Sequence, residues 1–232
     1  MQSWAFALSA SIFLTFGNST MNSSPDFIQL LIAICAGFSL SAACGFRIFV
    51  PLLAMALSAR FAGLPLDSSF AWVTGDAAII TLGVATIAEI LAYYIPLFDN
   101  MLDTIAVPGA ILAGGIVSFG LLGEMPEWLQ WSVSIIGGSG AAGAVQMGTT
   151  TARTLSTAGT AGTANPIIST LENILSIFGT VMAIFLPILA AVGALVFIIV
   201  SLWFVPKMIM KLRRKKQTPT TPAMPPVPPA VS

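Results

Sequence analysis

Long apolar runs, separated by short polar or proline-containing breaks, make up most of this chain. A helix needs about 20 consecutive apolar residues to cross the hydrocarbon core of a bilayer, and several of the runs are that long. The pattern therefore predicts an all-α fold, that of a polytopic integral membrane protein with about six transmembrane helices. The runs cover approximately residues 27–62, 72–95, 108–123, 131–152, 166–186 and 187–204.

The first run is too long for one straight crossing, because about 36 residues of helix extend to about 54 Å. Gly45 and Pro51 lie near its middle, and proline removes a backbone donor and clashes with the preceding helical turn. We expect a spanning helix to about Cys44, a bend, and a second helical piece to about Arg60. Arg47 falls within this bend, in an otherwise apolar segment.

Further breaks are predicted in the rest of the chain. Pro187 should separate two spans joined by a tight turn, because one helix over both runs would overshoot the bilayer. The stretch 149–165 is rich in threonine, glycine and alanine and predicts a flexible or broken helix. Residues 96–103 are expected to form a short acidic link between two spans.

The domain organisation follows from these runs. Residues 1–26 form an apolar N-terminal extension that is too short to span, and it is interpreted as an interfacial helix or a loose segment, with a cleaved signal peptide as the alternative. Residues 27–212 form the transmembrane domain, with halves at about 27–123 and 128–206. Residues 213–232 are basic and then proline-rich, which predicts a disordered tail.

The amino-acid composition supports a membrane protein and argues against several kinds of catalytic and metal site. Hydrophobic residues make up 56% of the chain and charged residues 8%, whereas soluble domains average about 25% charged residues. The chain has no histidine, so the commonest general base and metal ligand is missing. Cys35 and Cys44 lie too far apart on one predicted helix to form a disulfide. We therefore expect no metal, no other cofactor and no enzymatic activity.

Six of the nine basic residues lie in the cluster at 207–216. The positive-inside rule then predicts a protein of the cell (inner) membrane with a cytoplasmic C-terminus. Six spans would place Asp26 on that same side. The expected partners are the lipid bilayer, anionic lipid at the basic cluster, and a small solute or ion. Nucleic acid is not expected, and a homo-oligomer is left open.

The few charges within the apolar runs are the candidate site residues. A charge at the centre of a membrane helix costs about 2.5–3.5 kcal/mol on insertion scales, so Arg47 should face protein or water. Glu89 and Glu172 are its natural partners, one from each half, and the three predict an intramembrane polar site. Arg153 is a further candidate, which either meets an anion or Glu172 or lies in a cytoplasmic loop.

Asp99 and Asp103 are weaker candidates. They are one helical turn apart and would share a face of a helix. Two carboxylates could bind a cation, but a solvated cytoplasmic loop explains the same residues. The intramembrane charges also have a second interpretation, in which structural ion pairs fix the packing of the helices or the charges lie at the membrane interfaces.

The two halves of the chain carry similar segments in the same order. SAACG at 41–45 is similar to SGAAG at 139–143, and the segments around Glu89 and Glu172 are also alike. The segment that begins at Pro108 is similar to the one that begins at Pro187. Three spans per half would invert the second half in the membrane, so the pattern suggests an inverted repeat with broken helices, as in secondary transporters.

The same segments carry a resemblance to a known family. The sequence SAACGFRIFVPLLAMAL at 41–57 resembles the opening motif of an uncharacterised bacterial membrane family, domain of unknown function 4126. EILAYYIPLFDNMLD at 89–103, VPGA at 107–110 and NPIISTLENILS at 165–176 resemble its later motifs. The resemblance covers about residues 37–216. It implies a multi-helix membrane domain and brings no assigned activity with it.

Two functional hypotheses remain from the sequence. The first is a small-solute or ion transporter, or a channel-like protein, that binds near the intramembrane charges. The second is a non-transporting membrane scaffold or assembly factor whose charges only fix the packing of the helices. A wet cavity at the charges favours transport, whereas charges used up in dry pairs favour a scaffold.

Overall fold

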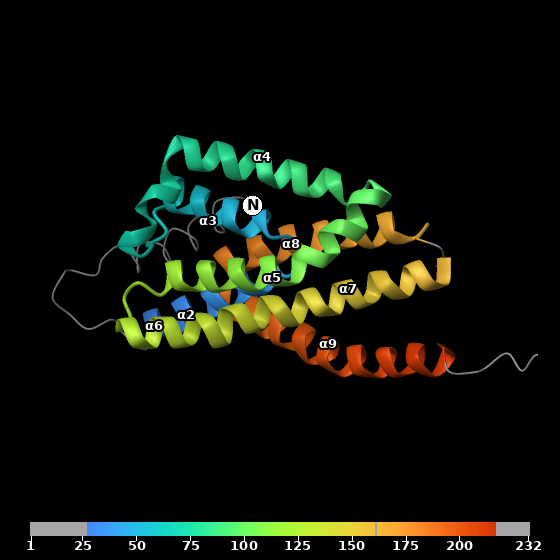
Figure 1. Cartoon of the computed structure of the whole chain (residues 1–232). Coiled ribbons are helices and arrows are strands. Elements are labelled where there is room, and N and C mark those ends of the chain that lie inside the picture. Colours follow the sequence, from blue (N-terminus) through green and yellow to red (C-terminus); the bar gives the residue numbers. More distant parts are fainter. Residues whose placement is uncertain (1–26, 161, 217–232) are drawn as a thin grey trace, which may run out of the picture.

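The computed structural model describes residues 27–160 and 162–216, and every element in that part of the chain is helical. The predictions for residues 1–26 and 217–232 lie outside the described residues. Figure 1 shows the helices side by side in one bundle. They are α2 (Phe27–Cys44), α3 (Phe49–Ala62), the 3-10 helix η1 (Ser68–Thr74), α4 (Asp76–Ala92), α5 (Pro96–Leu121), α6 (Glu127–Val133), the π-helical segment η2 (Ser134–Ser139), α7 (Gly140–Thr160), α8 (Asn165–Phe185) and α9 (Pro187–Lys216).

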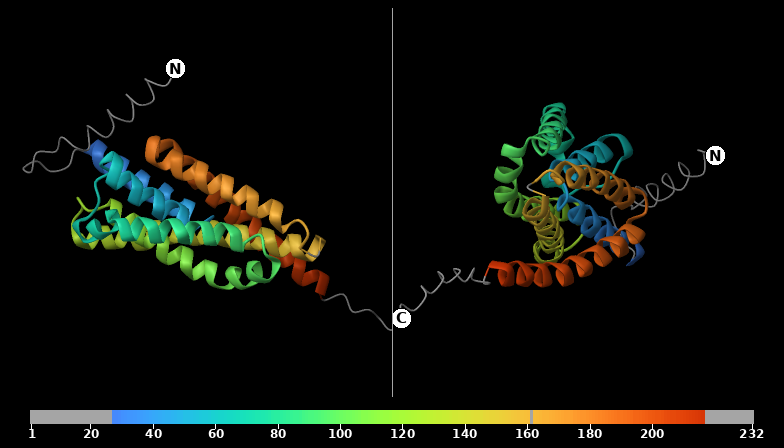
Figure 2. Two further views of the ribbon diagram at one scale, coloured as in Figure 1. Left: turned by 90° about the horizontal axis from the view of Figure 1, so that it is seen from above. Right: turned by 90° about the vertical axis from the view of Figure 1, so that its right-hand side faces the viewer.

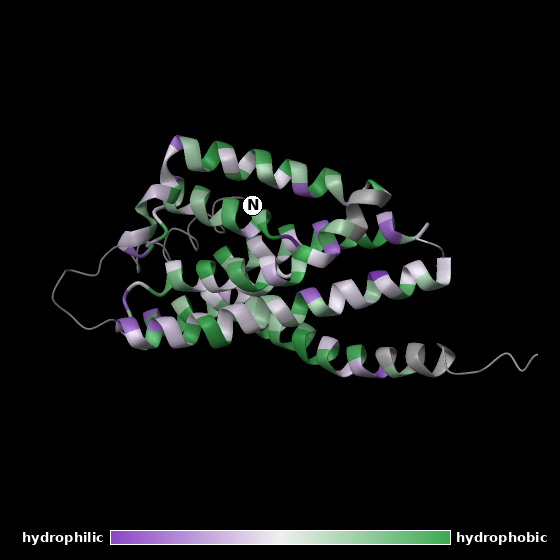
Figure 3. Cartoon of the chain, in the orientation of Figure 1, coloured by the Kyte–Doolittle hydropathy of each residue, from purple (hydrophilic) through white to green (hydrophobic). Residues whose placement is uncertain are grey.

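Length and hydropathy identify the helices that can cross a membrane. Among the described residues these are α2, the 101–121 part of α5, α8, and the 187–207 part of α9. The bent pair of η1 and α4, with 70° between its two helices, is a fifth candidate. The predicted all-α membrane fold is confirmed, but the predicted number of six spans is not. Figure 3 shows the long hydrophobic stretches on α4 and α9.

Helix α8 shows why lipid must surround the bundle. Its polar side chains face inward and are buried, whereas its large apolar side chains are exposed. A surface helix of a soluble protein has the opposite pattern. The buried polar residues are Ser169, Glu172, Asn173, Ser176 and Thr180, and the exposed apolar residues include Ile167, Leu171, Ile174, Ile177, Phe178 and Val181.

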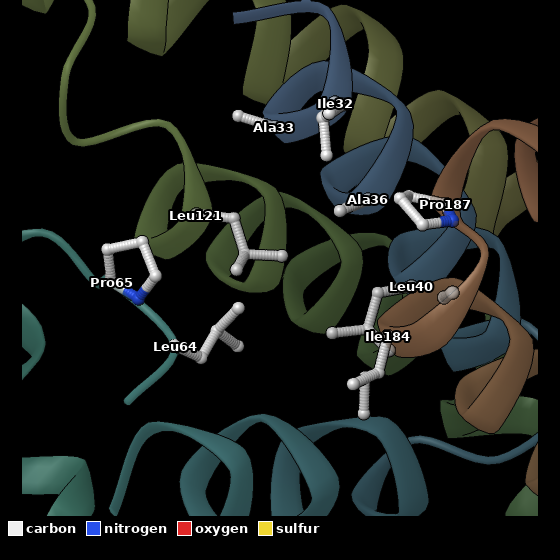
Figure 4. Close-up of a pocket in the computed structure, with 10 residues that line it drawn as sticks. Ile32, Ala33, Ala36, Leu40, Leu64, Pro65, Leu121, Ile184 and Pro187 are labelled. Atoms are coloured by element: carbon white, nitrogen blue, oxygen red, sulfur yellow. The ribbon is translucent and has the colours of Figure 1, made fainter. Parts of the chain in front are cut away.

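The break predicted in the first apolar run is present, and it reverses the chain. Helix α2 ends at Cys44 and α3 begins at Phe49. Leu64 and Pro65, just after α3, line the same small apolar cavity as Ile32 and Ala33 near the start of α2 (Figure 4). The two helices therefore enter and leave at the same end of the bundle. We call them the α2–α3 hairpin and residues 45–48 its tip.

This reversal fixes the two ends of the molecule. The cavity in Figure 4 also contains Leu121 from the end of α5 and Pro187 from the start of α9. We call this the entry end and the opposite one the exit end, where α9 finishes (Figures 1 and 2). Phe27 thus lies at the opposite end from the last turns of α9. The prediction for Asp26 lies outside the described residues.

Small residues let the central helices touch. A Cβ added at Gly114 of α5 would lie 2.5 Å from the Cβ of Ala142 and 2.7 Å from the carbonyl oxygen of Gly138. The Ser41 hydroxyl of α2 donates to the Gly114 carbonyl oxygen at 2.7 Å. In lipid, where apolar burial alone does not hold helices together, such close backbone contact supplies packing energy.

Three predicted boundaries are wrong. Residues 96–103 are not a link but the first turns of α5, and Pro108 lies inside that helix. The stretch 149–165 was expected to be flexible or broken throughout, but α7 continues to Thr160, and among the described residues the break lies at 162–164. Helix α9 continues through residues 213–216, which were expected to begin the disordered tail.

The suggested inverted repeat stays a prediction, and the directions of the helices do not follow it throughout. Helices α4 and α8 run in opposite directions, as do α5 and α9 (Figure 1). Helices α2 and α7 do not, because both come from the entry end. Instead, the two SAACG-like segments pack directly on one another, with Ala42, Ala141 and Val145 in one buried cluster.

Candidate functional site

The tip of the α2–α3 hairpin exposes a new helix N-terminus inside the bundle, and Glu89 of α4 caps it. The first N–H groups of an α-helix have no partner within the helix. The N–H of Ile48 donates to Oε1 of Glu89 at 2.8 Å, and the N–H of Phe49 donates to Oε2 at 3.0 Å. The carboxylate also faces the positive end of the helix dipole. Glu89, which was expected to pair with Arg47, thus accepts hydrogen bonds from the backbone of the tip instead.

Arg47 projects from the same tip toward α8 and is 1% exposed. Its Nε donates to Oδ1 of Asn173 at 2.5 Å, and its Nη2 donates to the carbonyl oxygen of Ser169 at 3.2 Å. Its Nη1 lies 3.2 Å from Oε2 of Glu172. One side chain therefore ties the hairpin tip to three consecutive inward-facing positions of α8.

Arg153 approaches the same carboxylate from α7. Its Nε donates to Oε1 of Glu172 at 3.0 Å, and its Nη2 forms an ion pair with Oε2. Its Nη1 lies 2.9 Å from Oδ1 of Asp103 on α5. The Glu172 carboxylate is therefore shared by Arg47 and Arg153. We call these four side chains the arginine network.

Tyr93, at the end of α4, completes the network. The guanidinium carbons of Arg47 and Arg153 each lie 4.0 Å from the centroid of its ring. A cation over an aromatic face gains about 0.5–1 kcal/mol at exposed sites and about 2 kcal/mol or more when it is desolvated. The ring is 5% exposed, so it also separates the two cations from solvent.

The charges of the network balance. Two guanidinium groups face two carboxylates, and buried charges are tolerated in proteins only when they are paired and hydrogen-bonded. Removing one partner leaves its neighbour buried without compensation, which typically costs about 3–5 kcal/mol. The network therefore holds α5, α7, α8 and the hairpin tip in one arrangement.

The structure places the predicted residues in three groups. Arg47, Arg153, Glu172 and Asp103 come together, so Arg153 and Asp103 do not lie in solvated loops. Glu89 lies at the hairpin tip. The side chain of Asp99, in the first turns of α5, lies outside the described residues. Among the described residues, no group of three or more His, Cys, Asp or Glu side chains could hold a metal ion.

Sequence reasoning missed three members of the site: Tyr93, Ser169 and Asn173. A signal for the two on α8 was available, because polar residues at 169, 172, 173, 176 and 180 recur at helical spacing within an apolar run. Such a stripe in a membrane helix must face protein. No comparable pattern marked Tyr93, which lies at the end of its helix.

The comparison with protein families agrees with this architecture. Residues 34–207 match the model of the family described as Domain of unknown function (DUF4126). The chain belongs to this family. The match extends from within α2 to within α9, so the DUF4126 domain contains the hairpin, the arginine network and Tyr93. Searches of curated proteins and of solved structures each found no match.

Proposed function

We propose that this DUF4126 protein is a small-solute or ion transporter, or a channel-like protein, with the tip of the α2–α3 hairpin as its gate. The observation that carries the proposal is the hairpin, which re-enters the bundle and ends against buried charges. Non-helical backbone at membrane depth is tolerated only where protein buries it or where it lines a water-filled cavity. Secondary transporters build their substrate sites at such discontinuous helices.

The contacts of the tip suggest how the gate works. Arg47 connects the tip to α8, and Glu89 connects it to α4. A solute with charged or polar groups could replace either the carboxylate that Arg47 contacts or the carboxylate that the tip backbone contacts. A shift of the tip away from α8 would free the guanidinium of Arg47 and one side of the Glu172 carboxylate. These groups would then face the space that the tip vacates. The network as described is the closed arrangement.

The orientation of the protein is also part of the proposal. The basic residues at 207–216, in the last turns of α9, favour the cytoplasmic side for the exit end, by the positive-inside rule. The arginine network lies toward that end, and the hairpin then enters from the outer face of the cell (inner) membrane.

A membrane scaffold is the second candidate, and one observation favours it. The charges of the network are buried and paired with one another. Such a closed set would be enough to fix the packing of α5, α7, α8 and the hairpin without any transport. The two functions differ in whether the network must open.

Uptake into proteoliposomes distinguishes the two candidates. Wild type, Arg47→Gln and Glu89→Gln are compared over a panel of ions and small metabolites. Arg60→Gln is the matched control, because Arg60 forms an exposed ion pair with Asp76 outside the network. We expect flux from the wild type and the control, and flux altered by about tenfold or more when a buried charge contact is lost. Equal flux from all four proteins would contradict the proposed gate, and no flux of any solute would favour the scaffold.

A further inference from the structure

A second cavity lies beside the hairpin tip, which contributes Phe46 to its lining. It has a volume of about 420 Å³ and lies between α2, α8 and α9. Its lining side chains are apolar apart from Ser39, and Phe178, Leu189 and Val192 at its rim are exposed. Ligand sites typically have volumes of about 300–1,000 Å³. We call this cavity the α8–α9 groove.

Two aromatic rings close the groove toward the exit end. Phe46 of the hairpin tip and Phe197 of α9 both line it and meet edge to face, with ring centroids 4.9 Å apart. Phe46 directly precedes Arg47 in the chain. The hairpin tip therefore contributes one residue to the lining of the groove and the next residue to the arginine network.

Helix α8 continues from the groove into the network along one face. Leu175, Gly179 and Met182 line the groove, and Glu172 lies one helical turn before Leu175 on the same stripe. An elongated molecule lying along this stripe would have its chain in the groove and its end at the Glu172 carboxylate. That carboxylate is the group that Arg47 and Arg153 now share.

From this continuity we infer that the groove and the arginine network together form a binding site for a single-chain carboxylate amphiphile, namely a long-chain fatty acid anion from the bilayer. The acyl chain occupies the α8–α9 groove, and the carboxylate takes the place of Glu172 on the two guanidiniums once Phe46 and Phe197 separate. The displaced Glu172 carboxylate takes up a proton, so that the two guanidiniums still face two negative charges. A carboxylate is the expected head group because a carboxylate already fills the position between the arginines. This inference rests on the proposed function and names its substrate class.

Direct binding tests the site separately from transport. Radiolabelled palmitate is titrated onto the full-length protein in nanodiscs, with empty nanodiscs as the blank. Gly193→Leu fills the groove without touching the network, because a Cβ at Gly193 meets no atom within 4 Å. Gly83→Leu on α4 is the matched control, because Gly83 is equally open and lies outside the groove.

The inference predicts that palmitate binding is saturable. Gly193→Leu should weaken it by about tenfold or more, because the acyl chain loses its apolar cavity. Gly83→Leu should leave it unchanged. The inference also predicts that Glu172→Gln tightens binding, because the competing carboxylate is gone. A purely structural role for Glu172 would not give that result. Palmitate should bind more tightly than hexadecanol, which has the same chain and no charge.

Four outcomes would overturn the inference. The first two are the absence of saturable palmitate binding and equal palmitate binding by Gly193→Leu and Gly83→Leu. The other two are equal affinity for palmitate and hexadecanol, and displacement of palmitate by lysophosphatidylglycerol at a lower concentration than by unlabelled palmitate. The last would identify a phospholipid as the ligand. Because the experiment measures binding alone, saturable palmitate binding without flux in the liposome experiment would refute the transporter and leave the site standing.

Discussion

At the residue scale, Tyr93 is the side chain on which both buried cations depend. Arg47 and Arg153 approach its ring at equal distances, and among the described residues no other aromatic ring lies over either guanidinium. Its hydroxyl is not needed for this role, because the attraction comes from the ring face. The ring and the hydroxyl can therefore be tested apart.

We predict that Tyr93→Leu lowers stability, whereas Tyr93→Phe is close to wild type. Two desolvated cation–π contacts are lost with the ring, each worth about 0.5–2 kcal/mol. The measurement is thermal unfolding of the purified protein in detergent, followed by circular dichroism. Equal midpoints for the leucine and phenylalanine variants would show that the ring does not hold the cations.

A second prediction concerns Gly45, the first residue of the hairpin tip. A Cβ there would lie 2.5 Å from the carbonyl oxygen of Ala142 and 2.5 Å from the Cβ of Val145. Because backbone cannot move aside cheaply, Gly45→Ala should destabilise the protein by about 1–3 kcal/mol. Gly83→Ala, in open space within α4, should leave stability unchanged or raise it by up to about 1 kcal/mol. Equal unfolding midpoints in the same detergent assay would show that the tip does not pack against α7.

At the element scale, the short helix η1 is held at the entry end by Asp67. Its Oδ1 accepts from the Ser69 hydroxyl at 2.5 Å and from the Ser69 N–H at 2.9 Å, and its Oδ2 accepts from Nε2 of Gln130 at 3.2 Å. These donors, above all the Ser69 hydroxyl, lower the pKa of the Asp67 carboxyl below its usual value.

This shift gives a pH prediction for η1. Because the folded pKa lies below the unfolded value of about 3.9, the carboxylate stabilises the fold fully above that value. The stabilisation is lost as the pH falls through the lower folded pKa. Asp67→Asn lacks the titrating group, so the wild type should be the more stable at pH 6 and lose that advantage toward pH 3. A difference in unfolding midpoint that stays constant from pH 6 to pH 3 would contradict this assignment.

Some helices and helix boundaries could be predicted from the sequence, and others could not. Apolar runs predicted helices over most of the described chain, and Gly45 and Pro51 predicted the break between α2 and α3. Helix α7 was misjudged because its threonines and Arg153 resemble a polar loop. Thr149 and Arg153 are in fact buried against neighbouring helices. Composition does not show on which side of a helix its neighbours lie.

At the scale of the whole molecule, the hairpin decides the topology. A break in a run of about 36 residues fits a kinked crossing as well as a reversal, because both need the same glycine and proline. Only the places of residues far apart in the chain distinguish them, such as Leu64 and Ile32, which line one cavity. The same holds for the site. The pairing of Arg47 with Glu172 was suggested by charge, but the shared carboxylate and the cap at Glu89 depend on the reversal.

Cysteine labelling from one side of the membrane tests the reversal most directly. Phe27→Cys, Ala62→Cys and Thr163→Cys each add one exposed cysteine, at the start of α2, at the end of α3 and before α8. A membrane-impermeant maleimide is applied to sealed vesicles, and the wild type with Cys35 and Cys44 sets the background. The reversal predicts that Phe27→Cys and Ala62→Cys react from one side and Thr163→Cys from the other. Reaction of Phe27→Cys from the side opposite to Ala62→Cys would mean that the run 27–62 crosses the membrane, and the hairpin would be refuted.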